Sequence, residues 1–129
     1  MRDDIAAAVQ ERNWAIVGAS NDRSKFGNKI YRDLRDAGYR VFAVHPSEDS
    51  VEGDPAYRSV LDLPEPVAVV DVVVPSWVGQ QIAKDAAEAN IPYFWLQPGA
   101  ESRELIENAE ALGLKVIHHA CAMVEKQRW

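Results

Sequence analysis

The sequence is poor in cysteine. Cys121 is the only cysteine among 129 residues, so no disulfide can form within the chain. That usage is compatible with a reducing compartment. The first residues, Met1–Asp4, are charged and lead into a helical pattern rather than an apolar leader. These features predict a cytoplasmic protein.

Long apolar runs and an excess of basic residues are both lacking. The longest strongly apolar stretch, Val67–Pro75, is interrupted by Asp71 and is too short to cross a bilayer. Asp and Glu number 20 against 14 Lys and Arg, which gives a net charge of −6. Because binding to phosphate backbones needs clustered basic residues, the sequence predicts neither a nucleic-acid nor a membrane partner.

Apolar runs alternate with segments of helical spacing along the chain. The predicted strands are residues 14–17, 40–44, 68–74, 93–96 and 115–117. Residues 47–66 contain Gly53, Pro55, Pro64 and Pro66 and are predicted to be irregular. Strands that alternate with helices indicate an α/β class protein. The prediction is one three-layer, Rossmann-like domain over 1–129, with a five-stranded parallel sheet.

The most informative segment runs from Trp14 to Gly27, where an apolar run ends at Gly18 and a polar, partly basic loop follows. A strand, a Gly-led loop and a helix together form a common phosphate site, because loop amides and the helix N-terminus carry positive partial charge. The dinucleotide spacing G-x-G-x-x-G is missing, since Ser20 and Arg23 stand where glycines are expected. The other interpretation is an ordinary, solvated turn.

The loop offers several groups to a phosphate. We expect Gly18 to allow the tight turn and the amides of Ala19 and Ser20 to point at the ligand. The Ser20 hydroxyl adds a donor, and Arg23 and Lys25 add charge-assisted contacts.

Ligands of open α/β sheets lie beyond the carboxyl ends of the strands. This rule selects the loops 18–26, 45–48, 75–77 and 97–100, and we expect the exit prolines Pro46, Pro75 and Pro98 to form flat, rigid walls. The second strand ends at His45 rather than at the acidic residue typical of NAD sites. A phosphorylated ribose, as in NADP or coenzyme A, therefore fits better than NAD.

Five segments in order resemble the coenzyme A-binding domain family, which contains small stand-alone bacterial proteins and the nucleotide-binding domain of the succinyl-CoA synthetase α subunit. The segments are WAIVGAS (14–20), VFAVHP (41–46), DVVVP (71–75), WLQPG (95–99) and HACAM (119–123). The last segment departs from the Asp-Arg-Cys-Pro run typical of the family.

The resemblance implies a set of binding residues for coenzyme A (CoA). The loop from Gly18 to Lys25 would hold the CoA phosphates, with His45 and Pro46 beside the adenosine and Val74 and Pro75 along the nucleotide. Gln97, Pro98 and Gly99 would lie near the pantetheine arm. The site residues expected in the loop are Gly18, Ala19, Ser20, Arg23, Ser24 and Lys25.

No complete catalytic set is visible in the sequence. The resemblance implies that the phosphorylated histidine of the larger synthetase lies in a separate domain, and the P-loop pattern G-x-x-x-x-G-K-[ST] is absent. We therefore predict a non-catalytic protein that binds CoA or an acyl-CoA, alone or with a protein partner. The alternatives are an NADP- or NAD-binding oxidoreductase or redox sensor, and an interaction subunit with a vestigial site.

Several single residues carry further expectations. Adjacent histidines on an extended segment point to opposite sides, so His118 and His119 are not expected to share a metal, and no metal is predicted. Cys121 is a small, partly buried residue or a thiol that forms a mixed disulfide with CoA. Asp71 is expected to pair with another group or cap a loop. Ser76 is a candidate N-cap.

The tryptophans differ in their expected places. Trp14 and Trp95 lie in predicted strands and are expected in the core. Trp77 lies at a loop on the carboxyl side of the sheet, where it either covers a ligand or packs against the protein.

Overall fold

The computed structural model describes residues 1–129, in which helices and strands alternate. The helices are α1 (Arg2–Gln10), α2 (Phe26–Asp36), α3 (Ser76–Glu88), α4 (Arg103–Ala111) and α5 (Ala122–Glu125), with a short 3₁₀ helix η1 (Val60–Asp62). The strands are β1 (Asn13–Val17), β2 (Arg40–Val44), β3 (Ser50–Val51), β4 (Asp54–Tyr57), β5 (Val69–Val72), β6 (Tyr93–Leu96) and β7 (Lys115–Ile117).

The sheet has seven strands in the order β3-β4-β2-β1-β5-β6-β7, so the prediction of five parallel strands is wrong in number. The two extra strands come from the segment predicted to be irregular. β4 pairs with β2 in parallel through Ala43 and Ala56, and β3 pairs with β4 antiparallel, which makes the sheet mixed. Gly53 and Pro55 hid this hairpin, because both residues are typical of turns, while a strand near the sheet edge tolerates proline.

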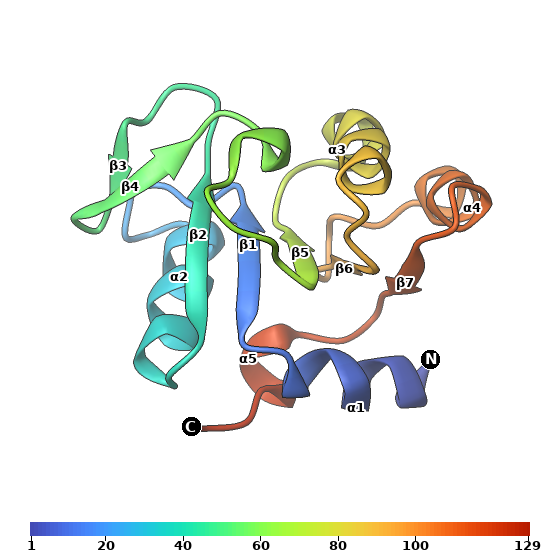
Figure 1. The fold of residues 1–129 in the computed structure, drawn as a ribbon, viewed down its shortest axis with the longest axis horizontal. Coiled ribbons are helices and arrows are strands. Elements are labelled where there is room, and N and C mark those ends of the chain that lie inside the picture. Colours follow the sequence, from blue (N-terminus) through green and yellow to red (C-terminus); the bar gives the residue numbers. More distant parts are fainter.

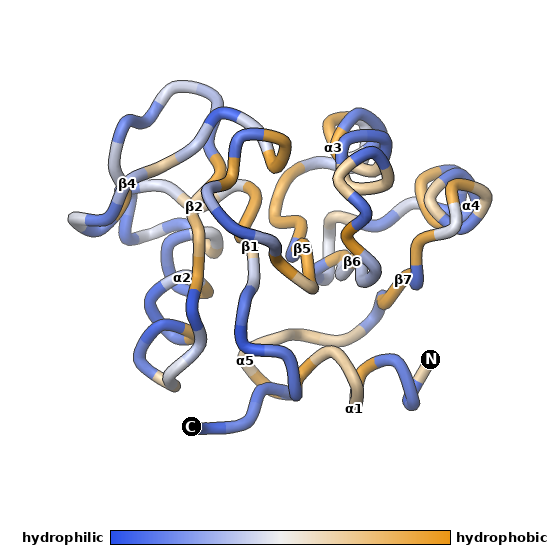
Figure 2. Tube along the Cα trace, in the orientation of Figure 1, coloured by the Kyte–Doolittle hydropathy of each residue, from blue (hydrophilic) through white to orange (hydrophobic).

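Helices cover both faces of the sheet, so the predicted three layers are confirmed (Figure 1). Alternate strand residues point to opposite faces. Ile16, Val69 and Trp95 pack with α1, α2 and α5, whereas Val17 and Val70 pack with α3 and α4. Figure 2 shows the resulting pattern, with most of β5 hydrophobic and much of α2 hydrophilic.

Trp14 and Trp95 are fully buried, as predicted, on the same face of the sheet. Their ring centroids lie 5.4 Å apart. Each indole N–H finds a backbone carbonyl, that of Glu11 at 2.7 Å and that of Ala120 at 2.9 Å. Both rings therefore contribute apolar area without leaving a buried donor unsatisfied.

Helix α2 begins unusually close to the end of β1, because Gly27 lies against the backbone of Gly18. A Cβ on Gly27 would overlap the Gly18 carbonyl oxygen and lie 2.7 Å from its carbon. Gly18 itself has φ +103°, and a Cβ there would lie 2.6 Å from the Val73 carbonyl oxygen. Close packing of helix on strand is the usual task of the third glycine in G-x-G-x-x-G, and Gly27 performs it after a longer loop.

The start of α3 differs from the prediction. Ser76 is the first helical residue, and Pro75 is the N-cap with φ −56° and ψ 150°, without a side-chain cap. The extended conformation of Pro75 moves the helix start one residue earlier than a serine cap would place it. Ser76 is therefore not the N-cap.

Asp71 lies in the middle of β5, between Ile16 of β1 and Trp95 of β6, and is fully buried. Neither carboxyl oxygen has a hydrogen-bond partner, so the expectation that Asp71 pairs or caps a loop is wrong. Its position in a central strand places it between the apolar residues Ile16 and Trp95. Burial raises the pKa of Asp71 well above the ordinary carboxyl range, so the group is held in its neutral form.

Removing the carboxyl of Asp71 should flatten the pH dependence of folding stability. The folded state keeps a proton on Asp71 that the unfolded chain releases above about pH 4. Between that pH and the raised folded pKa, the unfolding free energy of the native protein falls with rising pH, by up to about 1.4 kcal/mol per pH unit from this group. In Asp71→Asn this contribution is lost, which urea denaturation at several pH values measures.

Asp36→Asn is the matched control, since Asp36 is an exposed aspartate on α2. The same slope in Asp71→Asn as in the Asp36 variant and the native chain would contradict the assignment of a neutral, buried Asp71.

A methyl group at Gly27 should separate α2 from β1. Gly27→Ala is expected to lower the unfolding free energy by about 1–3 kcal/mol, the usual cost of overpacking against atoms that cannot move aside. Gly79→Ala on α3 is the control, because its Cβ would meet the flexible Leu105 side chain, and alanine has the higher helix propensity. Equal unfolding free energies of the two variants would show that the close approach of α2 to β1 does not contribute to stability.

Candidate functional site

The ends of four parallel strands meet at one edge of the sheet. Val17 pairs with Val44 of β2 and with Val72 of β5, and Val72 pairs with Leu96 of β6. The loops that follow β1, β2 and β6 contain those selected from the sequence. The loop after β5 is residues 73–75 rather than the predicted 75–77, because β5 ends at Val72 and Ser76 and Trp77 already belong to α3. Because the strands end in register, the loops lie side by side, as predicted.

The first of these loops is tied together by its own hydrogen bonds. The Ser20 hydroxyl accepts from the amide of Asp22 at 3.2 Å, and the Ser20 carbonyl accepts from Asn28 at 2.8 Å. The amide and the hydroxyl of Ser24 both donate to the Asp22 carboxylate. Ala19 and Ser20 are buried. The loop therefore has a defined shape before any ligand arrives.

Arg23 is paired with Glu52, which lies in the turn between β3 and β4. The two side chains form a bidentate contact with distances of 2.6 and 3.2 Å. Glu52 also accepts from Asn28 at 2.9 Å, and the hydrogen bonds from Arg23 and then Asn28 lower the pKa of Glu52 to about 2. Because the Arg23 side chain is 67% exposed, its guanidinium is held near the loop yet open to solvent.

The N-terminus of α2 has the charge pattern of an anion site. Lys25 occupies the N-cap position, no side chain caps the helix, and the first turn holds no acidic residue. The first-turn amides and the helix dipole favour negative charge at this point. Arg23 and Lys25 add full positive charge beside it.

Two cavities open along this edge of the sheet. The β2-side cavity has a volume of about 370 Å³. It is lined by Val17, Gly18, Val44, His45, Pro46, Arg58, Ser59, Val60, Val74, Pro75, Val78, Gln81, Ile82 and Asp85. The β6-side cavity has a volume of about 700 Å³. It is lined by Phe26, Ile30, Val73, Val74, Pro75, Ser76, Trp77, Gln97, Pro98, Gly99, Ala100 and Cys121.

Val74 and Pro75 line both cavities, so the segment after β5 is a shared wall. The structure brings eight of the predicted site residues to the two cavities: Gly18, His45, Pro46, Val74, Pro75, Gln97, Pro98 and Gly99. The remaining five, Ala19, Ser20, Arg23, Ser24 and Lys25, belong to the loop and line neither cavity. Their role toward a phosphate stays a prediction.

Sequence reasoning missed Arg58 and its neighbours in the β2-side cavity. Arg58 follows β4, and β4 runs parallel to β2, so its end reaches the same edge. The guanidinium contacts the Glu48 carbonyl and the Asp49 carboxylate, at 2.6 Å for the latter. Recognising residues 54–57 as a strand would have revealed this cation.

His45 is oriented by its own loop. Its Nδ1 accepts from the amides of Ser47 at 3.1 Å and Glu48 at 3.0 Å. In the neutral ring, the proton therefore lies on Nε2. This arrangement fixes the ring beside Pro46 in the β2-side cavity.

Gln97 closes the inner end of the β6-side cavity. The side chain is buried, donating to the Cys121 sulfur at 3.3 Å and accepting from the Ala122 amide at 2.9 Å. Gln97 thus ties the end of β6 to the start of α5. Cys121 lines the same cavity, and its mixed disulfide with CoA stays a prediction.

The expectation that His118 and His119 point apart is wrong. His119 has φ +59°, so the segment is not extended, and the two ring centroids lie 4.7 Å apart with the Nδ1 atoms in contact. No group of three or more histidine, cysteine, aspartate or glutamate side chains is placed to hold a metal ion.

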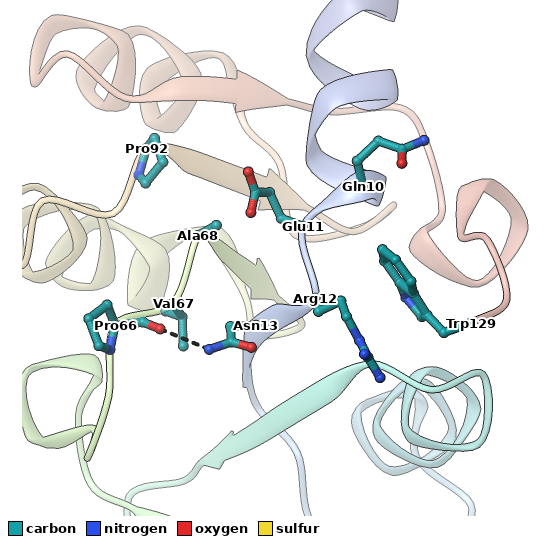
Figure 3. A pocket seen from close by; sticks show the side chains of 9 residues that line it. All are labelled: Gln10, Glu11, Arg12, Asn13, Pro66, Val67, Ala68, Pro92 and Trp129. Atoms are coloured by element: carbon teal, nitrogen blue, oxygen red, sulfur yellow. Dashed lines mark hydrogen bonds between the residues drawn. The ribbon is translucent and has the colours of Figure 1, made fainter.

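A further cavity of about 570 Å³ lies at the opposite edge, where the strands begin (Figure 3). Its lining includes Gln10–Asn13, Pro66–Ala68 and Trp129, and none of the predicted site residues. Arg12 lies over the Trp129 ring, 5.0 Å from its centroid. The amino ends of the strands are not where parallel sheets hold ligands.

Several known proteins are similar to this chain in sequence or in structure. An acetate–CoA ligase (ADP-forming) of Archaeoglobus fulgidus is 32% identical over 117 residues, which are 83% of this chain and 17% of the ligase. The uncharacterized protein YneT of Bacillus subtilis is 28% identical over 129 residues and 96% of both chains. A solved conserved hypothetical protein of Pyrococcus furiosus is 45% identical with a TM-score of 0.85, over 89% of this chain and 99% of that one.

The chain therefore spans about a sixth of the ligase and nearly the full length of the other two relatives. None of its helices has the length and apolar character needed to span a membrane. Residues 12–127, which include both cavities at the carboxyl edge, match the family described as the CoA binding domain. The protein belongs to the CoA binding domain family.

Proposed function

We propose that this protein binds CoA or an acyl-CoA along the carboxyl edge of its sheet, without carrying out a reaction on it. The observation that carries the proposal is the pair of cavities on either side of Val74 and Pro75. Arg58 and Asp85 line one cavity beside apolar residues, and no charged side chain lines the other. CoA has the same division, with a phosphorylated nucleotide at one end and a pantetheine thiol at the other.

The nucleotide end fits the β2-side cavity. The diphosphate would lie at the loop from Gly18 to Lys25, over the N-terminus of α2. The adenosine would lie between Pro46 and Pro75, with Arg58 as the cation for the phosphate on its ribose. Arg23 would exchange Glu52 for a ligand phosphate, because its guanidinium is already exposed.

The pantetheine end fits the β6-side cavity. From the shared wall, the arm would run toward the backbone of Gln97–Gly99. The Gln97 side chain already has its partners, so it would shape this end of the site rather than react. No ionised side chain lines this cavity to serve as a general acid or base.

The biological role follows as part of the same proposal. Because no ionised side chain lines the β6-side cavity, the protein would hold CoA rather than form a thioester. It would act in the cytoplasm and deliver CoA to, or sense it for, a protein partner.

An NADP-binding oxidoreductase or redox sensor is the second candidate. It is favoured by one observation, the cationic Arg58 in place of an acidic ribose ligand at the β2-side cavity. NADP and CoA share an adenosine that carries an extra phosphate, so this end of the site accepts either. The apolar β6-side cavity favours pantetheine over a nicotinamide riboside.

Calorimetric titration with CoA, NADP and NAD tests this proposal. We expect CoA to bind more tightly than NADP, and NAD to bind most weakly, since it lacks the phosphate that Arg58 would contact. Arg23→Ala should weaken CoA binding by about 1–3 kcal/mol, the range for a hydrogen bond to a charged group.

Arg103→Ala is the control for the change in net charge, because Arg103 lies on α4 with its side chain 92% exposed and lines neither cavity. Tight binding of NADP without binding of CoA would favour the oxidoreductase. Binding of none of the three would favour an interaction subunit.

A further inference from the structure

The β6-side cavity is larger than the β2-side cavity and carries no charge. Its volume is about 700 Å³ against about 370 Å³, and none of its twelve lining residues is an aspartate, glutamate, lysine, arginine or histidine. Volumes of this size are typical of pockets that enclose a small molecule. The cavity thus offers room for a ligand group that needs no counter-charge.

Two of the polar groups in this cavity already have partners. Gln97 donates to Cys121 and accepts from Ala122, and the Gly99 amide points to the Glu101 carboxylate at 3.2 Å. No cation lines the cavity to pair with a negatively charged ligand group. Ile30, Val73 and Val74 give it apolar surface.

Two large aromatic side chains at this cavity are exposed. Trp77 is 77% exposed and comes from the first turn of α3, and Phe26 is 64% exposed and begins α2. Both line the cavity, although they belong to different helices. An apolar ligand group would cover them, and burial of aromatic surface stabilises a complex.

The cavity adjoins the proposed nucleotide site. Val74 and Pro75 belong to both cavities, so a ligand anchored at the β2 side passes over them into the β6 side. Resting on the proposed function, we propose that the β6-side cavity holds the neutral, apolar acyl group of an acyl-CoA thioester, with Trp77 as a specificity residue. The ligand class is a fatty acyl-CoA of medium length, in preference to free CoA and to acyl groups that carry a carboxylate.

Calorimetry with the full chain and three probes, CoA, hexanoyl-CoA and succinyl-CoA, tests the inference. Hexanoyl-CoA should bind at least about tenfold more tightly than CoA, because its methylene groups leave water for apolar surface. Succinyl-CoA should bind no more tightly than CoA, since its carboxylate has no cation in the cavity. Equal affinity for hexanoyl-CoA and CoA, or tighter binding of succinyl-CoA, would overturn the inference while leaving CoA binding itself intact.

Trp77→Ala locates the acyl group. The ratio of CoA to hexanoyl-CoA dissociation constants should fall at least about fivefold in this variant, which a thermal melt first confirms as folded. Val124→Ala is the control, because Val124 is 78% exposed on α5 and lines neither cavity, so its ratio should equal that of the native chain. An unchanged ratio in Trp77→Ala would place the acyl group elsewhere and overturn the assignment. Failure of all three probes to bind would instead contradict the proposed function, and this inference with it.

Discussion

Helix α2 approaches the end of β1 more closely than a residue with a side chain allows, because Gly27 lies against the Gly18 carbonyl. This contact sets the position of the helix N-terminus over the edge where β1, β2, β5 and β6 end. The positive end of the helix consequently lies at this edge. Gly18 lines the β2-side cavity and Phe26, the first residue of α2, lines the β6-side cavity, so both cavities adjoin this contact.

The wall of Val74 and Pro75 stands between the two cavities. On the β2 side, the charged lining residues are Arg58 and Asp85, beside apolar ones. On the β6 side, no lining side chain is charged, and the Gln97 side chain already has its partners. One segment thus lies between two cavities that a single ligand would occupy. An acyl-CoA, with a charged nucleotide at one end and an apolar acyl group at the other, fits both.

The sequence predicted the parts of this site that follow from periodicity and from strand ends. The runs at 40–44, 93–96 and 115–117 are strands with the expected bounds, and the loops after four strands share an edge. It could not reveal β3 and β4, because Pro55 and the turn at Gly53 have the local signature of a loop and their pairing is decided by tertiary contacts. Arg58 was missed for the same reason.

Other misses came from interactions between distant residues. Nothing local to Arg23 indicates its pairing with Glu52, 29 residues along the chain. The unpartnered burial of Asp71 contradicts the ordinary rule that a buried carboxyl has a partner. The left-handed conformation of His119 turned two adjacent rings together, which an extended segment does not allow.

The central claim is that the ligand lies along the carboxyl edge and crosses the wall of Val74 and Pro75. Amide chemical-shift mapping of the ¹⁵N-labelled protein during titration with CoA tests it most directly. The account predicts the largest shifts in residues 18–26, at Val74 and in residues 97–100. Shifts concentrated at residues 10–13 and 66–68, around the cavity of Figure 3, would contradict it.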